Sequence, residues 1–152
     1  MSARDHAERF DGGFGLLHDG RWNSRGRPVT YCATGPALCL LERLVHVRDL
    51  DRLPDATMLV RYHAPDGLAL DVQPLERLPL WWRADADTTR SIGDDWLDSM
   101  SAPLLAVPSA VVPVAASDDR NILVNHRHAD AERIAIARTE RFEFDPRLFP
   151  FA

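Results

Sequence analysis

The segment that most constrains the fold is a helix start signal followed by an apolar run. Thr34-Gly35-Pro36 offers a capping residue and a proline that is tolerated in a first helical turn. The residues from Ala37 to Val45 then carry apolar side chains at helical spacing, with Glu42 interrupting the run. We therefore predict a helix that begins here and ends near Val47.

Most of the remaining chain indicates strands. Short β-branched or alternating segments are separated by turn residues, and they span 28–33, 57–62, 68–72, 104–114, 122–124, 133–138 and 141–145. Pro65-Asp66-Gly67 is expected to join the second and third segments as a hairpin, and the prolines within 104–114 favour an edge or bulged strand. A short helix capped by Ser91 is predicted for 91–100. The glycine-rich stretch 10–27 is predicted as loop, with at most a short strand near Arg21. Together these patterns predict an α+β domain with more sheet than helix.

Length and charge narrow the class of protein. The 152 residues fit a single domain spanning residues 1–152. The net charge of -5 argues against direct nucleic-acid binding, because a phosphate-tracking surface needs clustered Lys and Arg. Charged residues appear from Arg4 onward, which argues against an N-terminal export signal. The longest uncharged run, 101–117, is too short and too rich in proline for a membrane span. Cys32 and Cys39 are interpreted as core residues in a reducing compartment, so a cytoplasmic protein is expected.

Two charged residues are candidate site residues, each with a structural alternative. Glu42 either emerges on the solvent-exposed stripe of the predicted helix or leans into a cleft, and periodicity alone favours the exposed stripe. Arg21 follows Gly20, which lets the backbone approach a ligand, and precedes Trp22, which could wall a pocket. An exposed arginine beside a structural tryptophan is the alternative.

Tyr31 and Ser109 complete the set of candidates. Tyr31 lies in the strand before the helix and could present its ring to a planar ligand, although a core tyrosine is the commoner case. Ser109 follows Pro108 in a stiffened strand that would hold a hydroxyl still, which is a weak signal alone. No Gly-x-Ser-x-Gly elbow surrounds Ser109, so a serine hydrolase is disfavoured.

Other motifs for nucleotide or metal binding are incomplete. Gly13-Phe14-Gly15 lacks the third glycine of a dinucleotide fingerprint, and the chain has no phosphate-binding Gly-Lys-Ser/Thr. His126-Arg127-His128 with Asp130 resembles a metal-binding pair, but nothing else is spaced to complete a coordination sphere. A polar loop is the favoured interpretation, and no metal is expected.

The order of these pieces resembles one known family, the RES domain family, named for an arginine, a glutamate and a serine. The resemblance begins with Gly20-Arg21-Trp22-Asn23, Tyr31-Cys32-Ala33 and Ala37-Leu38-Cys39-Leu40-Leu41-Glu42. It continues through Leu78-Pro79, Trp82, Ile92-Gly93-Asp94-Asp95-Trp96-Leu97, Val107-Pro108-Ser109-Ala110-Val111-Val112-Pro113, the segment 121–125 and Phe144-Asp145-Pro146-Arg147-Leu148. Each motif alone is weak evidence, but the ordered set covers nearly the whole chain. Where the family usually has Asn-Pro, this chain has Asn125-His126, and its Asp118-Asp119-Arg120 loop is also atypical.

The resemblance implies a fold, an activity and partners. Members resemble the ADP-ribosyltransferase toxins, with a mixed, largely antiparallel split β-sheet and a few flanking helices. They are toxins of toxin–antitoxin pairs that degrade NAD+ by hydrolysis or phosphorolysis. The expected partner is a helix-turn-helix (Xre-type) antitoxin. The resemblance leaves open whether this chain forms a homo-oligomer within that complex. NAD+ is the substrate, with inorganic phosphate as a co-substrate in the phosphorolytic case, and no tightly bound cofactor is expected.

The residue types suit cleavage of a nicotinamide–ribose bond. Glu42 would stabilise oxocarbenium-like charge and orient the attacking group, and Arg21 would pair with the pyrophosphate. Tyr31 would stack on nicotinamide, and Ser109 would hydrogen-bond ribose or carboxamide. The surrounding Trp22, Asn23 and Asn125 are expected cofactor-binding residues. Two rival functions remain open: an ADP-ribosyltransferase that modifies a macromolecule, and a non-catalytic partner-binding module.

Overall fold

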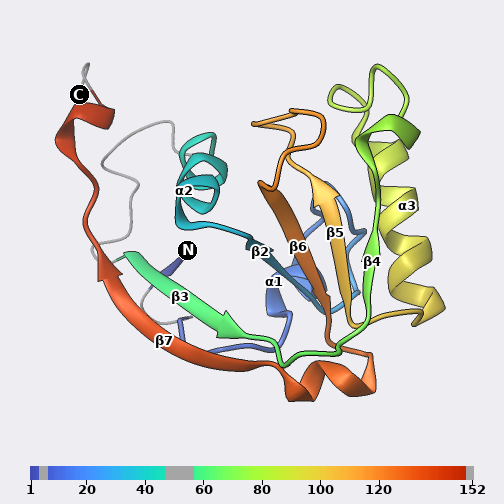
Figure 1. The fold of residues 1–152 in the computed structure, drawn as a ribbon, viewed down its shortest axis with the longest axis horizontal. Coiled ribbons are helices and arrows are strands. Elements are labelled where there is room, and N and C mark those ends of the chain that lie inside the picture. The colour runs from blue at the N-terminus through green and yellow to red at the C-terminus, as the bar shows by residue number, and fades with distance from the viewer. Residues whose placement is uncertain (4–6, 47–56, 150–152) are drawn as a thin grey trace.

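The structure, a computed structural model, describes residues 1–3, 7–46 and 57–149. Two β-sheets open away from each other, with helix α2 between them and helix α3 on the outer side of the second sheet (Figure 1). The first sheet has the order β1-β3-β7 and the second the order β2-β6-β5-β4; all pairs are antiparallel except β4 with β5. This confirms the predicted α+β class with a largely antiparallel sheet core.

The elements of the described chain have the following bounds. The strands are β1 (Ser2–Ala3), β2 (Val29–Ala33), β3 (Thr57–His63), β4 (Leu70–Val72), β5 (Leu104–Pro108), β6 (Arg120–Asn125) and β7 (Ala135–Phe142). The α-helices are α1 (Gly13–Leu17), α2 (Pro36–Leu44) and α3 (Ala86–Ser99), and the short 3-10 segments are η3 (Leu75–Arg77), η4 (Ala129–Arg133) and η5 (Pro146–Leu148). In this part of the chain, no helix is long and apolar enough to cross a bilayer.

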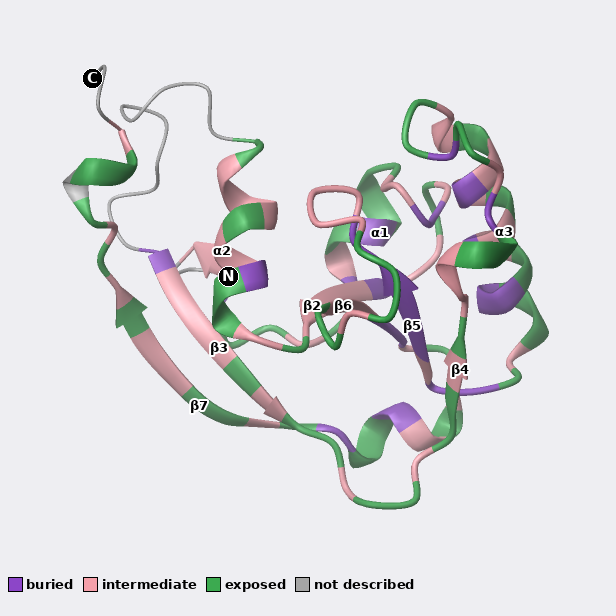
Figure 2. Cartoon of the chain, turned by 45° about the horizontal axis from the view of Figure 1, so that its top comes forward, coloured by how far each residue is buried: buried purple, intermediate pink, exposed green. Residues whose placement is uncertain are grey.

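The main core lies between α3 and the second sheet. Trp96 and Leu97 of α3 pack with Trp22 against Leu105 and Leu123 of the sheet, and all of these side chains are buried. Figure 2 shows β5 buried along most of its length, as expected for a strand with a neighbour on both sides and a helix over one face. The predicted edge strand at 104–114 is therefore wrong: the strand stops at Pro108 and lies between β6 and β4.

Helix α2 confirms the helix predicted after Thr34-Gly35-Pro36, although a different residue occupies its N-cap position. Pro36 is the first helical residue, and Gly35, not Thr34, occupies the N-cap position. The Thr34 hydroxyl instead donates to the Asp118 carbonyl, so it ties the helix start to the loop before β6. The helix ends at Leu44, and the predicted end near Val47 lies outside the described residues.

Helix α3 begins earlier than predicted. Asp85 caps it by accepting from the backbone N–H groups of Asp87 and Thr88, so the predicted cap at Ser91 is wrong. The helix packs closely at Gly93, where a Cβ would overlap the backbone carbonyl of Trp22. This contact places the loop of residues 20–24 directly against α3.

The predicted hairpin of 57–62 with 68–72 is also wrong. Both strands form, but β3 pairs with β7 in the first sheet, and β4 pairs in parallel with β5 in the second. The turn at Gly67 therefore carries the chain from one sheet to the other. Two further local predictions differ from the structure. Helix α1 lies within the predicted loop 10–27, although residue 21 lies in a bend as the loop prediction allows. One strand, β7, replaces the two strands predicted near the C-terminus.

Candidate functional site

The carboxylate of Glu42 is held by two donors from elsewhere in the chain. Glu42 lies near the C-terminal end of α2 and is half-buried. Its Oε1 accepts from the Ser109 hydroxyl at 2.8 Å and from the Asn121 side-chain amide at 2.6 Å. Of the two alternatives for this residue, the structure therefore favours the inward one. Hydrogen bonds to a carboxylate are among the stronger ones in proteins, so this side chain has a defined orientation.

The hydroxyl of Ser109 is completely engaged. Ser109 is fully buried (0% exposed) just after β5 ends. While donating to Glu42, the oxygen accepts from the backbone N–H groups of Val111 and Val112, both at 3.0 Å. A hydroxyl has one donor and two acceptor positions, so all three are filled. In this arrangement Ser109 acts on Glu42 and on the following loop, and its predicted bond to a substrate remains a prediction.

Asn121 is a site residue that sequence reasoning missed. It lies on β6 directly between Ala33 of β2 and Val107 of β5. The strand β2 leads into the helix that carries Glu42, and β5 ends one residue before Ser109. The available signal was alternation: Asn121, Leu123 and Asn125 share one sheet face, and a polar residue at an inward position needs a partner.

The hydroxyl of Tyr31 anchors the loop that carries Arg21. It accepts from the backbone N–H of Trp22 at 3.0 Å and donates to Oδ1 of Asn23 at 2.8 Å. Burial raises the pKa of the Tyr31 phenol, so the group stays protonated at physiological pH. A Cβ on Gly20 would lie 2.5 Å from this hydroxyl, which explains the glycine before Arg21.

Tyr31 also links this loop to the Glu42 contacts. Its partner across the β2–β6 ladder is Leu123, two residues from Asn121, so Tyr31 and Asn121 are diagonal neighbours on one face. Such neighbours lie about 7–8 Å apart in an antiparallel pair. The structure therefore places Tyr31 one step along the sheet from the residue that holds Glu42.

The guanidinium of Arg21 points to the loop before α3. It donates to the carbonyl oxygens of Trp82 at 3.4 Å and of Arg83 at 3.2 Å, and it lies 5.9 Å from the Trp82 ring centroid. Its side chain is half-buried. Arg21 thus joins two loops through its planar fork, while its predicted contact with a pyrophosphate remains a prediction.

The three surrounding residues are buried within the domain. Trp22 belongs to the main core, and the Asn23 amide donates to the carbonyls of His18 and Ser24. The Asn125 amide donates to the carbonyl of Leu97, and its Oδ1 accepts from the N–H of Arg127. Asn125 is four residues along β6 from Asn121, or roughly 14 Å at the usual rise of a strand, so it lies apart from Glu42. The cofactor-binding roles of these residues remain predictions.

The histidines of the loop after β6 both have hydrogen-bond partners within the domain. His126 pairs through Nε2 with the Thr30 hydroxyl at 2.8 Å, and burial lowers its pKa. Nδ1 of His128 accepts from the N–H of Asp130 and caps η4. Among the described residues, no group of three His, Cys, Asp or Glu side chains is placed to hold a metal ion.

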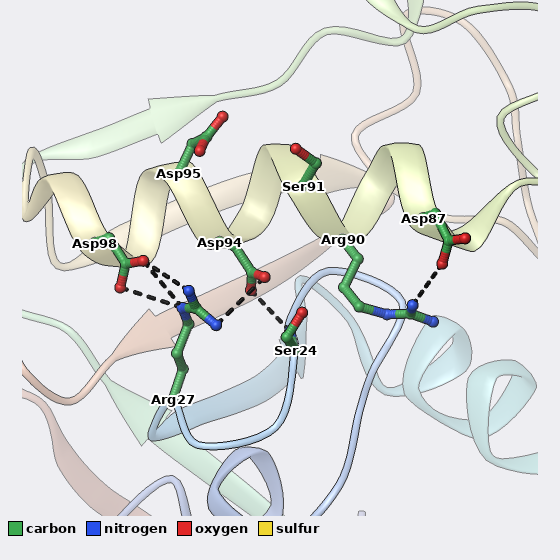
Figure 3. A pocket seen from close by; sticks show the side chains of 8 residues that line it. All are labelled: Ser24, Arg27, Asp87, Arg90, Ser91, Asp94, Asp95 and Asp98. Atoms are coloured by element: carbon green, nitrogen blue, oxygen red, sulfur yellow. Dashed lines mark hydrogen bonds and ion pairs between the residues drawn. The ribbon is translucent and has the colours of Figure 1, made fainter.

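A separate hollow of about 410 Å³ lies between α3 and the loop that carries Ser24 and Arg27 (Figure 3). Both arginines that line it are paired: Arg27 contacts Asp94 at 3.3 Å and Asp98 at 2.7 Å, and Arg90 contacts Asp87 at 2.6 Å. The Arg27 guanidinium lowers the pKa of Asp98. Neither Glu42 nor Ser109 lines this hollow, so it is distinct from the candidate site.

These features define an α+β domain with a helix-borne carboxylate fixed at one end of a largely antiparallel sheet. Its sequence matches the RES domain model over residues 2–145, and the chain belongs to the RES domain family. It is 40% identical to Toxin Res of Pseudomonas putida over 136 residues, which covers 89% of each chain. It is 36% identical to Toxin Res of Yersinia enterocolitica, covering 90% of this chain and 88% of the relative. It is also 32% identical to the Prs ADP-ribosylating toxin of a Sphingobium strain, covering 93% of this chain and 88% of the relative.

Proposed function

We propose that this protein is a toxin that degrades NAD+ by cleaving the nicotinamide–ribose bond. The observation that carries the proposal is the Glu42 carboxylate, fixed through Oε1 by Ser109 and Asn121. Membership of the RES family and the likeness to relatives named Toxin Res support the assignment as a toxin. The fold is proposed to be ADP-ribosyltransferase-like, which the likeness to a relative named as an ADP-ribosylating toxin supports.

In the proposed reaction, the bond between the ribose anomeric carbon and the nicotinamide nitrogen breaks first. The bonding electron pair leaves with neutral nicotinamide, and positive charge develops on the ribose. Glu42 stabilises that charge, since a fixed anion needs no reorganisation as the bond breaks. Water then forms the new bond and loses a proton, which gives ADP-ribose, nicotinamide and H+. With inorganic phosphate as the acceptor, the products are nicotinamide and ADP-ribose 1″-phosphate.

The other candidate residues have proposed supporting roles. Arg21 and Tyr31 would bind the dinucleotide, and Ser109 would act by holding Glu42. No metal or tightly bound cofactor takes part in this scheme, because NAD+ itself carries the leaving group. The protein would act in the cytoplasm, and its proposed partner is a helix-turn-helix antitoxin that does not need this chain to contact DNA.

The test is nicotinamide release from NAD+ by the purified protein. Wild type is expected to release nicotinamide, with or without added phosphate, and Glu42→Gln to lose at least about 100-fold in kcat. Glu132→Gln makes the same chemical change at an exposed carboxylate on η4 and should behave as wild type. Equal rates for wild type and Glu42→Gln under both conditions would refute the proposal.

A second candidate function is ADP-ribose transfer to a macromolecule. It is favoured by one comparison, the 32% identity to a relative named an ADP-ribosylating toxin. Incubating a bacterial lysate with NAD+ labelled in the adenylate half distinguishes the two functions. Label in ADP-ribose or its 1″-phosphate supports degradation, whereas label that depends on Glu42 and stays on protein or nucleic acid supports transfer.

The proposed toxicity and partner are tested in cells. Expression of wild type in bacteria should arrest growth and lower cellular NAD+, and Glu42→Ala should do neither. Co-expression of the neighbouring gene should restore growth if it encodes the antitoxin. Growth arrest by Glu42→Ala equal to that of wild type would favour the non-catalytic binding module.

A further inference from the structure

We propose that Asn121 is a positioning residue that sets the orientation of the Glu42 carboxylate, an inference that rests on the proposed NAD+ cleavage. The Asn121 amide donates to Oε1 of Glu42 at 2.6 Å, the shorter of the two contacts that reach this oxygen. The two residues are 79 positions apart in sequence, so the contact is made by the fold and not by local chain geometry.

The sheet register explains why this contact forms. Asn121 lies opposite Ala33, from which three residues lead to the first residue of α2. On its other side it lies opposite Val107, two residues before Ser109. Asn121 is therefore on the strand between the two segments that deliver Glu42 and Ser109. A donor at this position reaches the carboxylate from an inner strand of the sheet, at the end where β2 leads into α2.

The two donors to Glu42 are held by different parts of the fold, so Asn121 and Ser109 constrain the carboxylate independently. The Ser109 hydroxyl is tied to the backbone N–H groups of the loop that follows β5, so its position depends on that loop. The Asn121 side chain projects from β6, which is paired on both sides. Two donors from separate supports on one oxygen restrict the rotation of the carboxylate.

The chemistry of the position favours an amide. Asparagine offers N–H donors, whereas aspartate of nearly the same shape would place a second anion beside Glu42. A leucine of similar size removes the donor and retains most of the volume. These two replacements separate the loss of the hydrogen bond from the loss of packing.

The experiment measures kcat and KM for nicotinamide release, together with thermal unfolding, for Asn121→Leu and Asn121→Asp. Each is made with Glu42 and with Glu42→Gln. Because an enzyme carboxylate that rotates is in the reactive orientation for less of the time, we expect Asn121→Leu to lower kcat about 10- to 100-fold. KM should change less than about 2-fold, since the positioned group acts on the reacting bond. We expect Asn121→Asp to lower kcat more than Asn121→Leu does, because it places a second anion beside Glu42.

The Glu42→Gln background supplies the control. There Asn121→Leu should lower the residual rate less than about 2-fold, because the carboxylate it positions is gone. Asn121→Asp should lower Tm less in the Glu42→Gln background than beside the native Glu42, because the introduced glutamine amide donates to the new carboxylate. The Tm comparison tests the contact even if Asn121→Leu does not fold.

Three results would overturn the inference. One is a wild-type kcat for a folded Asn121→Leu. Another is a raised KM with unchanged kcat, which would make Asn121 a direct substrate ligand. The third is an equal effect of Asn121→Asp on Tm in both backgrounds. Absence of nicotinamide release from wild type itself would instead refute the proposed function, so the two failures are distinguishable.

Discussion

Because Ser109 links Glu42 to the loop after β5, we expect the removal of its single hydroxyl oxygen to lower the free energy of unfolding strongly. Ser109→Ala removes one oxygen and three hydrogen bonds: one to Glu42 and one each from the N–H groups of Val111 and Val112. The bond to a carboxylate is worth about 1.5–3 kcal/mol, and each amide left without an acceptor costs about 1 kcal/mol or more. Because the side chain is fully buried, water does not replace the lost oxygen without rearrangement.

We therefore expect Ser109→Ala to lower the free energy of unfolding by about 3–5 kcal/mol, or Tm by roughly 8–15 °C for a domain of this size. Ser117→Ala is the matched control, since its hydroxyl accepts one bond, from Asp119 N–H, in an exposed setting. It should cost less than about 1 kcal/mol. Urea unfolding followed by tryptophan fluorescence measures both. An equal loss in the free energy of unfolding for the two variants would refute the assignment of three stabilising hydrogen bonds to Ser109.

Three further substitutions test other contacts of the fold and site. Gly93→Ala should lower the free energy of unfolding, measured in urea, by at least about 3 kcal/mol, because the added Cβ would overlap the Trp22 carbonyl. At Gly35 an added Cβ would meet no neighbouring atom within 4 Å, so Gly35→Ala should lower it by less than about 1 kcal/mol. Burial lowers the pKa of His126, so the unfolded state binds more protons below about pH 6.5. Wild type should then lose stability from pH 6.5 to 5 more steeply than His126→Gln; parallel curves would contradict this. Arg21→Lys loses the fork that joins two carbonyls, so we expect a loss of about 1 kcal/mol and a raised KM for NAD+; an unchanged Tm would argue against the loop contact.

Local signals predicted the elements that are defined within a few residues. The proline at a helix start and the apolar spacing after it identified α2, and with it the element that carries Glu42. Alternation identified β2 and β3 within a residue of their observed bounds. Helix α3 was predicted, but with a start that is too late, because no large apolar residue marks its first turn after Asp85.

Pairing between distant segments could not be predicted in the same way. The turn at Pro65-Asp66-Gly67 favours a hairpin locally, yet β4 pairs with β5 more than thirty residues later. Parallel pairing leaves no turn signature, since its connection runs through η3 and α3. The same limit explains why Asn121 was missed: its partner is set by register across three strands, and no local pattern encodes it.

The uninterrupted register of β2 with β6 also explains why an ordered set of motifs was informative when each motif was weak. The ladder runs from Val29 opposite Asn125 to Ala33 opposite Asn121, and it places Tyr31 and Asn121 on the same face. A slip of one residue would turn every side chain of β2 to the opposite face and separate Tyr31 from the Glu42 contacts. The spacing between motifs is thus a physical constraint, because an insertion within either strand breaks the alignment on which the proposed site depends.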